Sequence, residues 1–166
     1  VVGLGAAGLI AMQELKAMGA AEVLAIDVLD ERLALARELG ASGTINSRKP
    51  EELQQIKDRP LQASVDATGA APGLQVALDH TRGPVVMYGV VHGDAVISTR
   101  HWYSGTYIPK RKQPDAQDTA FVQAIWCRGQ LDTEKFLGER LPFEEYGKGI
   151  EMLMDKQAVR VLYYPG

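Results

Sequence analysis

The sequence predicts an α/β domain built around a doubly wound parallel sheet. Short runs rich in Val and Ile alternate with longer amphipathic stretches, and the short runs are apolar at nearly every position. Parallel strands need crossover connections, and strands without polar alternation are buried on both faces, so helices are expected on each side of the sheet. The chain has 166 residues, and we expect residues 1–166 to form a single domain.

The helices are predicted from apolar residues that recur every three or four positions, as the core-facing side of a helix requires. Glycine follows several of these stretches and proline begins two of them, which suits helix ends and helix starts respectively. In chain order, the expected helices cover residues 7–18, 30–39, 50–57, 72–80, 119–128 and 144–156.

The strands are predicted from short apolar runs that are bounded by glycine, proline or polar turns. The clearest of them is 84–89, and the pattern weakens after it. In chain order, the expected strands cover residues 1–2, 21–27, 43–46, 63–68, 84–89, 95–98, 106–108 and 159–163. The polar run 110–118 predicts a solvated loop.

Composition excludes several classes of protein. Lys and Arg number 18 against 21 Asp and Glu, giving a net charge of −3, so no nucleic-acid partner is expected. No apolar run reaches the ~20 residues of a membrane-spanning helix, so no membrane partner is expected either. The single cysteine, Cys127, forbids an internal disulfide and suits a reducing compartment, for which the cytoplasm is the expectation.

The strongest functional pattern is a glycine motif at the start of the chain. Gly3, Gly5 and Gly8 follow a strand remnant and open the first expected helix. In such a unit the first glycine permits the tight turn, the second lets the backbone approach a pyrophosphate, and the third lets the helix lie close to the sheet. Free N–H groups and the helix dipole favour a phosphate at this point. The motif predicts a Rossmann dinucleotide-binding fold.

Asp27 adds a second part of this pattern at the end of the next expected strand. An acid about 20 residues after the glycines is placed to accept hydrogen bonds from the ribose hydroxyls of an adenosine. A 2′-phosphate would meet a carboxylate there, so NAD is expected as the cofactor rather than NADP. The alternative is a glycine turn used only for packing, with Asp27 as a helix cap.

Other proteins bind nucleotides on the same scaffold. FAD enzymes share the glycine fingerprint, and methyltransferases carry a shorter glycine run. Short-chain dehydrogenases require a Tyr followed four residues later by Lys, and none of the six tyrosines has this neighbour. The sequence therefore disfavours the short-chain class.

Residues 1–46 contain the runs GLGAAG, KAMGAAEVLAID, DERLALARELGA and TIN, and further landmarks lie at 65–70, 86–90, 141–144 and 158–162. With these segments the chain resembles the coenzyme domain of medium-chain, zinc-type alcohol and polyol dehydrogenases, the sorbitol dehydrogenase branch most of all. The resemblance covers nearly the whole chain and is weakest over residues 91–130. It implies an oxidoreductase that transfers a hydride between NAD and a secondary alcohol or polyol.

The resemblance also implies roles for individual residues around the cofactor. Asp27 and Arg32 would bind the adenosine ribose, and Arg160 the cofactor phosphates. The residues implied for the pyrophosphate are Gly3, Gly5, Ala7, Gly8 and Leu9. Those implied to flank the adenine and its ribose are Ala67, Thr68 and Gly69. Those whose backbone would hold the nicotinamide carboxamide are Tyr88, Gly89 and Val90.

Catalytic zinc in this family is held by a separate GroES-like domain, and nothing in the sequence corresponds to that domain. No pair of histidines has metal-ligand spacing, and Cys127, on an expected helix, is interpreted as a buried small side chain. Neither metal ligands nor catalytic residues are therefore expected in this chain. We expect a fragment whose parent enzyme holds the zinc in the missing catalytic domain and acts on a small-molecule alcohol or ketone.

Two other functions stay open at this point. One is a non-catalytic dinucleotide-sensing module, and the other is a zinc-independent quinone or enoyl reductase of the same superfamily, although Asp27 disfavours the NADPH that such reductases prefer. Residues 106–108 resemble the edge strand through which the family pairs two coenzyme domains. A homodimer is therefore expected.

Overall fold

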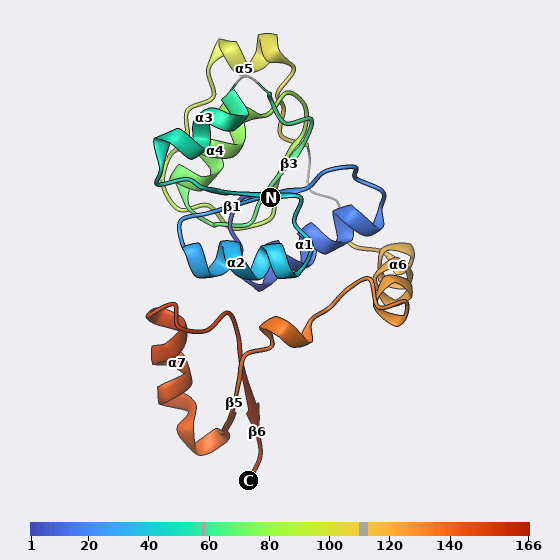
Figure 1. Cartoon of the computed structure of the whole chain (residues 1–166), viewed down its shortest axis with the longest axis vertical. Helices are drawn as coiled ribbons and strands as arrows, with labels where there is room; N and C mark the ends of the chain where they lie inside the picture. The colour runs from blue at the N-terminus through green and yellow to red at the C-terminus, as the bar shows by residue number, and fades with distance from the viewer. Residues whose placement is uncertain (58, 110–112) are drawn as a thin grey trace.

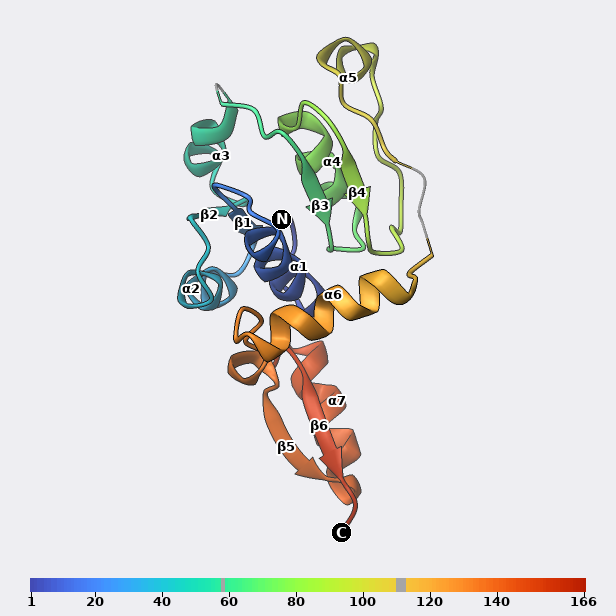
Figure 2. The same cartoon turned by 90° about the vertical axis from the view of Figure 1, so that its right-hand side faces the viewer.

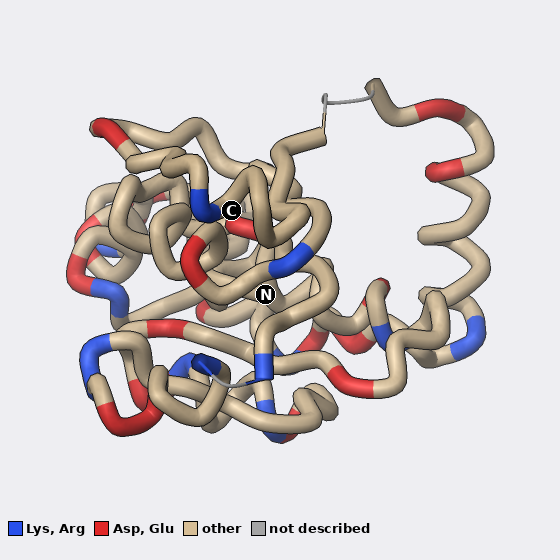
Figure 3. Tube along the Cα trace, turned by 90° about the horizontal axis from the view of Figure 1, so that it is seen from above, with Lys and Arg blue, Asp and Glu red and all other residues tan. Residues whose placement is uncertain are grey.

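The computed structural model describes residues 1–57, 59–109 and 113–166. A larger α/β body holds the first two thirds of the chain, and a smaller lobe formed by its end extends away from that body (Figures 1 and 2). Of the loop predicted at 110–118, residues 110–112 lie outside the described residues. Acidic and basic residues are dispersed over the described trace and do not gather on one side (Figure 3).

The body is organised around one parallel sheet whose strands do not follow chain order. Val1 and Val2 lie in the middle, because Val2 forms parallel bridges to Ile26 on one side and Asp66 on the other. Tyr107 is bridged to Pro84 and occupies the outer edge. The four longer strands are β1 Leu24–Asp27, β2 Gly43–Asn46, β3 Ser64–Asp66 and β4 Val85–Met87. The resulting order is β2, β1, Val2, β3, β4, Tyr107.

This order confirms the predicted doubly wound sheet, because it places the first strand centrally and builds outward in both directions. Alternate residues of the strands face two separate hydrophobic clusters: Val1 and Ala25 belong to one, and Val2 and Ile26 to the other. The first cluster packs against α1 Ala6–Ala17 and α2 Asp30–Glu38. The second packs against α3 Pro50–Lys57 and α4 Ala71–His80.

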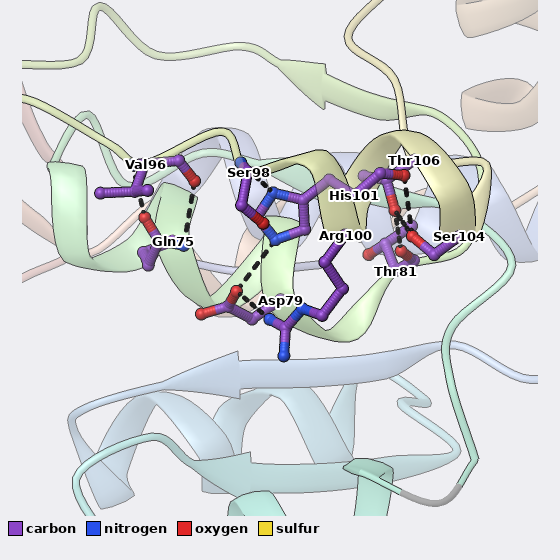
Figure 4. Close-up of polar contacts among 9 residues, drawn as sticks. All are labelled: Gln75, Asp79, Thr81, Val96, Ser98, Arg100, His101, Ser104 and Thr106. Carbon is purple, nitrogen blue, oxygen red and sulfur yellow. Dashed lines mark hydrogen bonds and ion pairs between the residues drawn. The ribbon is translucent and has the colours of Figure 1, made fainter.

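The region after β4 departs from the prediction. Residues 95–98 form no strand, and α5 Thr99–Ser104 follows them instead. Its buried His101 contacts Asp79 of α4 through Nε2 at 3.0 Å, and the Arg100 guanidinium donates to the same carboxylate at 2.8 Å (Figure 4). These contacts hold α5 on α4. They join segments about 20 residues apart, so no local sequence pattern predicts them.

Helix α6 Ala116–Cys127 begins three residues earlier than predicted. Asp115 caps it, because its carboxylate accepts hydrogen bonds from the backbone N–H groups of Gln117 and Asp118. The expectation that Cys127 is buried was wrong. Cys127 is exposed. Among the described residues of this helix, Ile125 is the one that is buried.

The C-terminal lobe has a small sheet of its own. β5 Glu139–Pro142 and β6 Val161–Tyr164 pair in parallel, and α7 Tyr146–Met154 packs against both. The lobe meets the body where Phe136 and Val159 pack against the cluster of α1 and α2. β5 was not predicted, because its sequence, Glu-Arg-Leu-Pro, carries too little apolar character to indicate a strand. No described helix has the length and apolarity needed to cross a membrane.

Lys156, just after α7, is the non-glycine residue with a positive φ, at 61°, among those described. We expect Lys156→Gly to raise the free energy of unfolding by about 0.5–1 kcal/mol. The left-handed region costs a residue with a Cβ roughly 1–2 kcal/mol, and the greater freedom of glycine in the unfolded chain cancels part of the gain. Urea unfolding of Lys156→Gly beside the wild type measures the difference.

The matched control is Glu151→Gly, an exposed position inside α7. It should lower the free energy of unfolding by about 0.5–1 kcal/mol, because glycine is a poor helix former. Equal destabilisation by both glycines would contradict the assignment of strain to Lys156.

Candidate functional site

The glycine turn leaves the sheet at its topological switch point. It connects the central Val1–Val2 segment to α1, between the carboxyl ends of β1 and β3 (Figure 2). Gly3 has a φ of +87°, and its N–H donates to the Ile26 carbonyl at 2.8 Å. Ligands of open α/β sheets bind in the crevice at such a switch point. The turn therefore stands where a ligand is expected from topology alone.

The three glycines of the turn meet different surroundings. A Cβ on Gly8 would overlap the carbonyl oxygen of Gly3, and a Cβ on Gly3 would lie 2.7 Å from Cγ2 of Thr68. Both glycines are therefore required by the close packing of the turn. A Cβ on Gly5 would meet no protein atom within 4 Å, and Gly5 has a φ of −67° that any residue adopts. Neither packing nor backbone conformation explains the glycine at position 5.

The start of α1 beside Gly5 is open to an anion. Gly5 is the N-cap residue and supplies no side-chain cap, and the first turn carries no acidic residue. The first N–H groups of a helix have no partner within it, and the helix dipole adds positive potential there. Ala7 is half-buried in this turn. Leu9 is fully buried and its N–H donates to the Gly5 carbonyl at 3.0 Å, so its observed role is to pack α1.

Asp27 faces the glycine turn from the end of β1. Its Oδ2 accepts a hydrogen bond from the backbone N–H of Leu4 at 2.6 Å. Its Oδ1 accepts from the N–H groups of Val28 at 2.7 Å and Leu29 at 3.0 Å. Two carboxylate oxygens offer about four acceptor positions, so Oδ2 keeps capacity for another donor. The carboxylate is thus fixed beside the turn by three backbone N–H groups and can still accept a further hydrogen bond.

Arg32 of α2 reaches the C-terminal lobe. Its Nη2 donates to the Ala158 carbonyl at 2.7 Å, whereas Nη1 is buried without a hydrogen-bond partner among the described residues. Burial lowers the pKa of the Arg32 guanidinium, and the nearby carboxylates of Asp27 and Glu31 oppose that shift. Arg32 also lines a cavity of about 410 Å³ between α2 and residues 155–159. The structure therefore brings Arg32 near Asp27, while its Nη2 is already hydrogen-bonded to the Ala158 carbonyl.

The loops after β3 and β4 lie against each other on the other side of the turn. A Cβ on Gly89 would come within 2.8 Å of the Gly69 nitrogen, and the N–H of His92 donates to the Gly69 carbonyl at 3.1 Å. Tyr88 and Val90 project from this pair of loops with exposed side chains. Ala67 and Thr68 connect the loops to the glycine turn, because a Cβ on Gly3 would contact both.

Arg160 lies in the connection between the lobe and the body, directly before β6. Its side chain is exposed and makes no hydrogen bond or ion pair within the described parts of the chain. Its backbone is fixed by a close approach to Gly138, where a Cβ would overlap the Arg160 carbonyl. The structure thus gives Arg160 a fixed backbone and a guanidinium without a partner among the described residues.

One absence and the position of one cavity limit the chemistry of the described residues. No group of three or more His, Cys, Asp or Glu among them could hold a metal ion, so zinc does not fit this part of the protein. The cavity of about 700 Å³ is lined by Val1, Leu24 and Ser64 at the amino ends of the strands, on the edge opposite the turn. It therefore does not belong to the site.

Asp66 is a residue of the site that sequence reasoning missed. It ends β3 as Asp27 ends β1, and it is completely buried. An acid at the end of an expected strand was the signal that could have identified Asp66. Burial of its carboxylate depends on packing between distant segments, which the sequence does not show.

Comparisons with known proteins agree with this geometry. Residues 6–111 match the family described as zinc-binding dehydrogenase. The chain is 27% identical over 177 residues to an alcohol dehydrogenase of Malus domestica, covering 98% of this chain and 46% of that protein. It is 26% identical over 181 residues to alcohol dehydrogenase 1 of Zea mays, with the same shares covered. The chain therefore spans about half the length of the curated relatives it matches.

Solved structures of similar fold are also dehydrogenases. An alcohol dehydrogenase from Thermotoga maritima has a TM-score of 0.84 at 28% identity, covering 99% of this chain and 48% of that one. The 2R,3R-butanediol dehydrogenase from Bacillus subtilis has a TM-score of 0.82 at 22% identity, covering 99% and 49%. The second likeness concerns the fold alone.

The different surroundings of Gly5 and Gly8 predict different costs of adding a methyl group. Gly8→Ala should lower the free energy of unfolding by about 3 kcal/mol, because the added Cβ overlaps backbone and the turn must shift. Gly5→Ala should lower it by less than about 1 kcal/mol, because alanine is a poorer N-cap residue than glycine but its Cβ meets no protein atom. Urea unfolding of both variants measures this, and a large loss at Gly5 would show that this glycine too is structural.

Proposed function

The chain belongs to the zinc-binding dehydrogenase family, and on this premise we propose that it forms the NAD(H)-binding part of an oxidoreductase. The proposed reaction transfers a hydride between NAD and a secondary alcohol or polyol, or reduces the corresponding ketone. The observation that carries the proposal is the unfilled space at Gly5, beside an uncapped helix start and the carboxylate of Asp27.

In the proposed complex the pyrophosphate lies over Gly5 and accepts hydrogen bonds from N–H groups at the start of α1. A side chain at position 5 would occupy the space that the phosphates need. Helix starts bind phosphate through these free N–H groups and the helix dipole. Gly3, Ala7, Gly8 and Leu9 support this cradle by forming the turn and packing the helix.

Asp27 accepts hydrogen bonds from the adenosine ribose in this proposal, using the remaining acceptor capacity of its carboxylate. Arg32 borders the same ribose in this proposal, because its guanidinium lies close enough to Asp27 for their charges to interact. A 2′-phosphate would bring negative charge against Asp27, which supports NAD as the cofactor in preference to NADP. Arg160 offers its guanidinium to the phosphates.

The nicotinamide half extends across the switch point toward β3 and β4. Tyr88, Gly89 and Val90 contribute backbone groups that orient the ring. Ala67, Thr68 and Gly69 flank the adenine and its ribose in this proposal, because they lie across the turn from Asp27. Bound NAD supplies the chemistry of hydride acceptance, and these residues bind and orient it.

Catalysis needs groups that we assign to the rest of the protein. The relatives are about twice as long as this chain, and the described residues hold no metal-binding cluster. We place zinc and the substrate-contacting residues in that other half, and the reaction in the cytoplasm. The present chain would then bind cofactor without turning over alcohol.

We further propose a homodimer formed through the edge segment at Tyr107. One side of Tyr107 pairs with β4, since the N–H of Val85 donates to its carbonyl at 2.8 Å and its own N–H donates to Gly83 at 3.1 Å. Apolar side chains are exposed beside it, at Trp102 and Tyr103 of α5. The contacts of α5 with α4 fix this surface (Figure 4). An unpaired edge flanked by exposed aromatic residues is suited to association.

Calorimetric titration with NADH and NADPH tests the proposed cofactor site through Asp27. Wild type should bind NADH much more tightly than NADPH. Asp27→Ala should weaken NADH binding by roughly 1–3 kcal/mol, the scale of charge-assisted hydrogen bonds, and should narrow the difference between the two cofactors. Unchanged NADH affinity in the variant would remove Asp27 from the ribose site.

The proposed dimer predicts that a charge on the edge prevents association. Ile108→Lys should convert the dimer to a monomer in light scattering, because burying an unpaired ammonium group is unfavourable. Met18→Lys, at another exposed apolar position, is the control and should remain dimeric. A monomeric wild type would contradict the proposed interface.

A further inference from the structure

Asp66 is a buried acid at the switch point to which the proposed function assigns no part. It is 0% exposed and ends β3, paired in register with Met87 and bridged to Val2. A carboxylate removed from water is costly unless hydrogen bonds compensate it. Its position therefore calls for an account of what those hydrogen bonds achieve.

One carboxylate oxygen of Asp66 sets the conformation of the loop after β3. Oδ1 accepts hydrogen bonds from the N–H of Thr68 at 3.1 Å and from its hydroxyl at 2.6 Å. The Thr68 oxygen in turn accepts from the N–H of Ala70 at 3.1 Å. Oδ2 has no hydrogen-bond partner among the described residues. The compensation thus comes from the Thr68 loop alone.

The position of Thr68 links this loop to two other parts of the site. Its methyl group lies where a Cβ on Gly3 would come within 2.7 Å, and its side chain would overlap a Cβ on Gly73 of α4. Thr68 therefore fills the space between the glycine turn and α4. Because its hydroxyl donates to Asp66, the orientation of the half-buried Thr68 side chain is fixed by the protein.

The backbone of Asp66 reaches the loop after β4. Its carbonyl accepts from the N–H of Tyr88 at 2.9 Å and weakly from that of Gly89 at 3.4 Å. Gly89 packs directly on Gly69, which follows Thr68. Asp66 thereby contacts both loops, through its side chain on one and its carbonyl on the other.

We propose that Asp66 is a positioning residue for the nicotinamide half of the cofactor, acting through the paired loops 67–71 and 88–92. This rests on the proposed NAD(H) site. A dinucleotide crosses the crevice with its adenosine at the acid of the second strand, here Asp27, so its nicotinamide half lies toward the loop 88–92, which packs on Gly69 of the loop 67–71. Loss of the Asp66 carboxylate removes the acceptor of the Thr68 hydrogen bonds and loosens the loop 67–71, on which the loop 88–92 packs. Asp27 and the start of α1 are unchanged.

The test measures NADH and AMP binding by calorimetry for wild type, Asp66→Ala and Asp66→Asn. We expect Asp66→Ala to weaken NADH binding about tenfold or more and AMP binding less than about threefold, since about tenfold corresponds to one lost hydrogen bond at a buried site. Asp66→Asn should restore most NADH affinity, because its amide oxygen can still accept from Thr68. The change in nicotinamide fluorescence on binding should fall in Asp66→Ala and return in Asp66→Asn.

Ser64→Ala is the matched control, two residues earlier on the same buried face of β3. Its hydroxyl is hydrogen-bonded to the Thr81 hydroxyl at 2.5 Å, at the end of β3 opposite the loop 67–71. It should reduce stability without changing the ratio of NADH to AMP affinity. If Asp66→Ala weakens NADH and AMP binding by the same factor, or weakens neither, the positioning role is overturned while the NAD(H) site stays in place. Failure of wild type to bind either ligand would overturn both proposals.

Discussion

The insertion of Val1 and Val2 between β1 and β3 is the constraint on which the site depends. Main-chain hydrogen bonds hold this segment on both sides. On the β1 side, the Val1 nitrogen donates to the Leu24 carbonyl at 2.7 Å, the N–H of Ile26 donates to Val1 at 2.8 Å and that of Gly3 donates to Ile26 at 2.8 Å. On the β3 side, the N–H of Val2 donates to Val65 at 2.9 Å and that of Ala67 donates to Val2 at 2.8 Å. They bring the ends of β1 and β3 to opposite sides of the turn. The acids that end these strands thus take up different tasks, one facing the crevice and one buried beneath it.

The glycine motif combines two physical requirements that its sequence pattern does not separate. Gly3 and Gly8 are required by contacts within the protein, where any Cβ would collide with backbone or with Thr68. Gly5 meets no steric requirement of the fold, because the space beside it is open, and the preference for glycine at an N-cap is modest. A ligand that approaches the backbone closely gives a physical reason for this third glycine. The argument for a cofactor therefore depends on Gly5 more than on the motif as a whole.

The parts of the structure that local pattern could predict are those fixed by local interactions. Glycine positions and the spacing of apolar residues predicted the turn, α2 and β2. The end of the expected strand close to the turn in sequence predicted where Asp27 lies. The contacts that the sequence could not predict join distant segments: His101 with Asp79, Arg32 with Ala158, and the burial of Asp66. Each depends on which elements pack together. β5 was missed for a related reason, because β6 makes it a strand by pairing with it.

The most direct test of the central claim is an NADH titration of Gly5→Val, paired with its thermal melt. The account predicts that the variant melts within a few degrees of wild type, because its Cβ meets no protein atom and only the N-cap preference for glycine is lost. It also predicts that NADH binding is abolished, because the side chain occupies the pyrophosphate space. Normal NADH binding by a folded Gly5→Val would contradict the account, since the open space at Gly5 would then have no part in holding the cofactor.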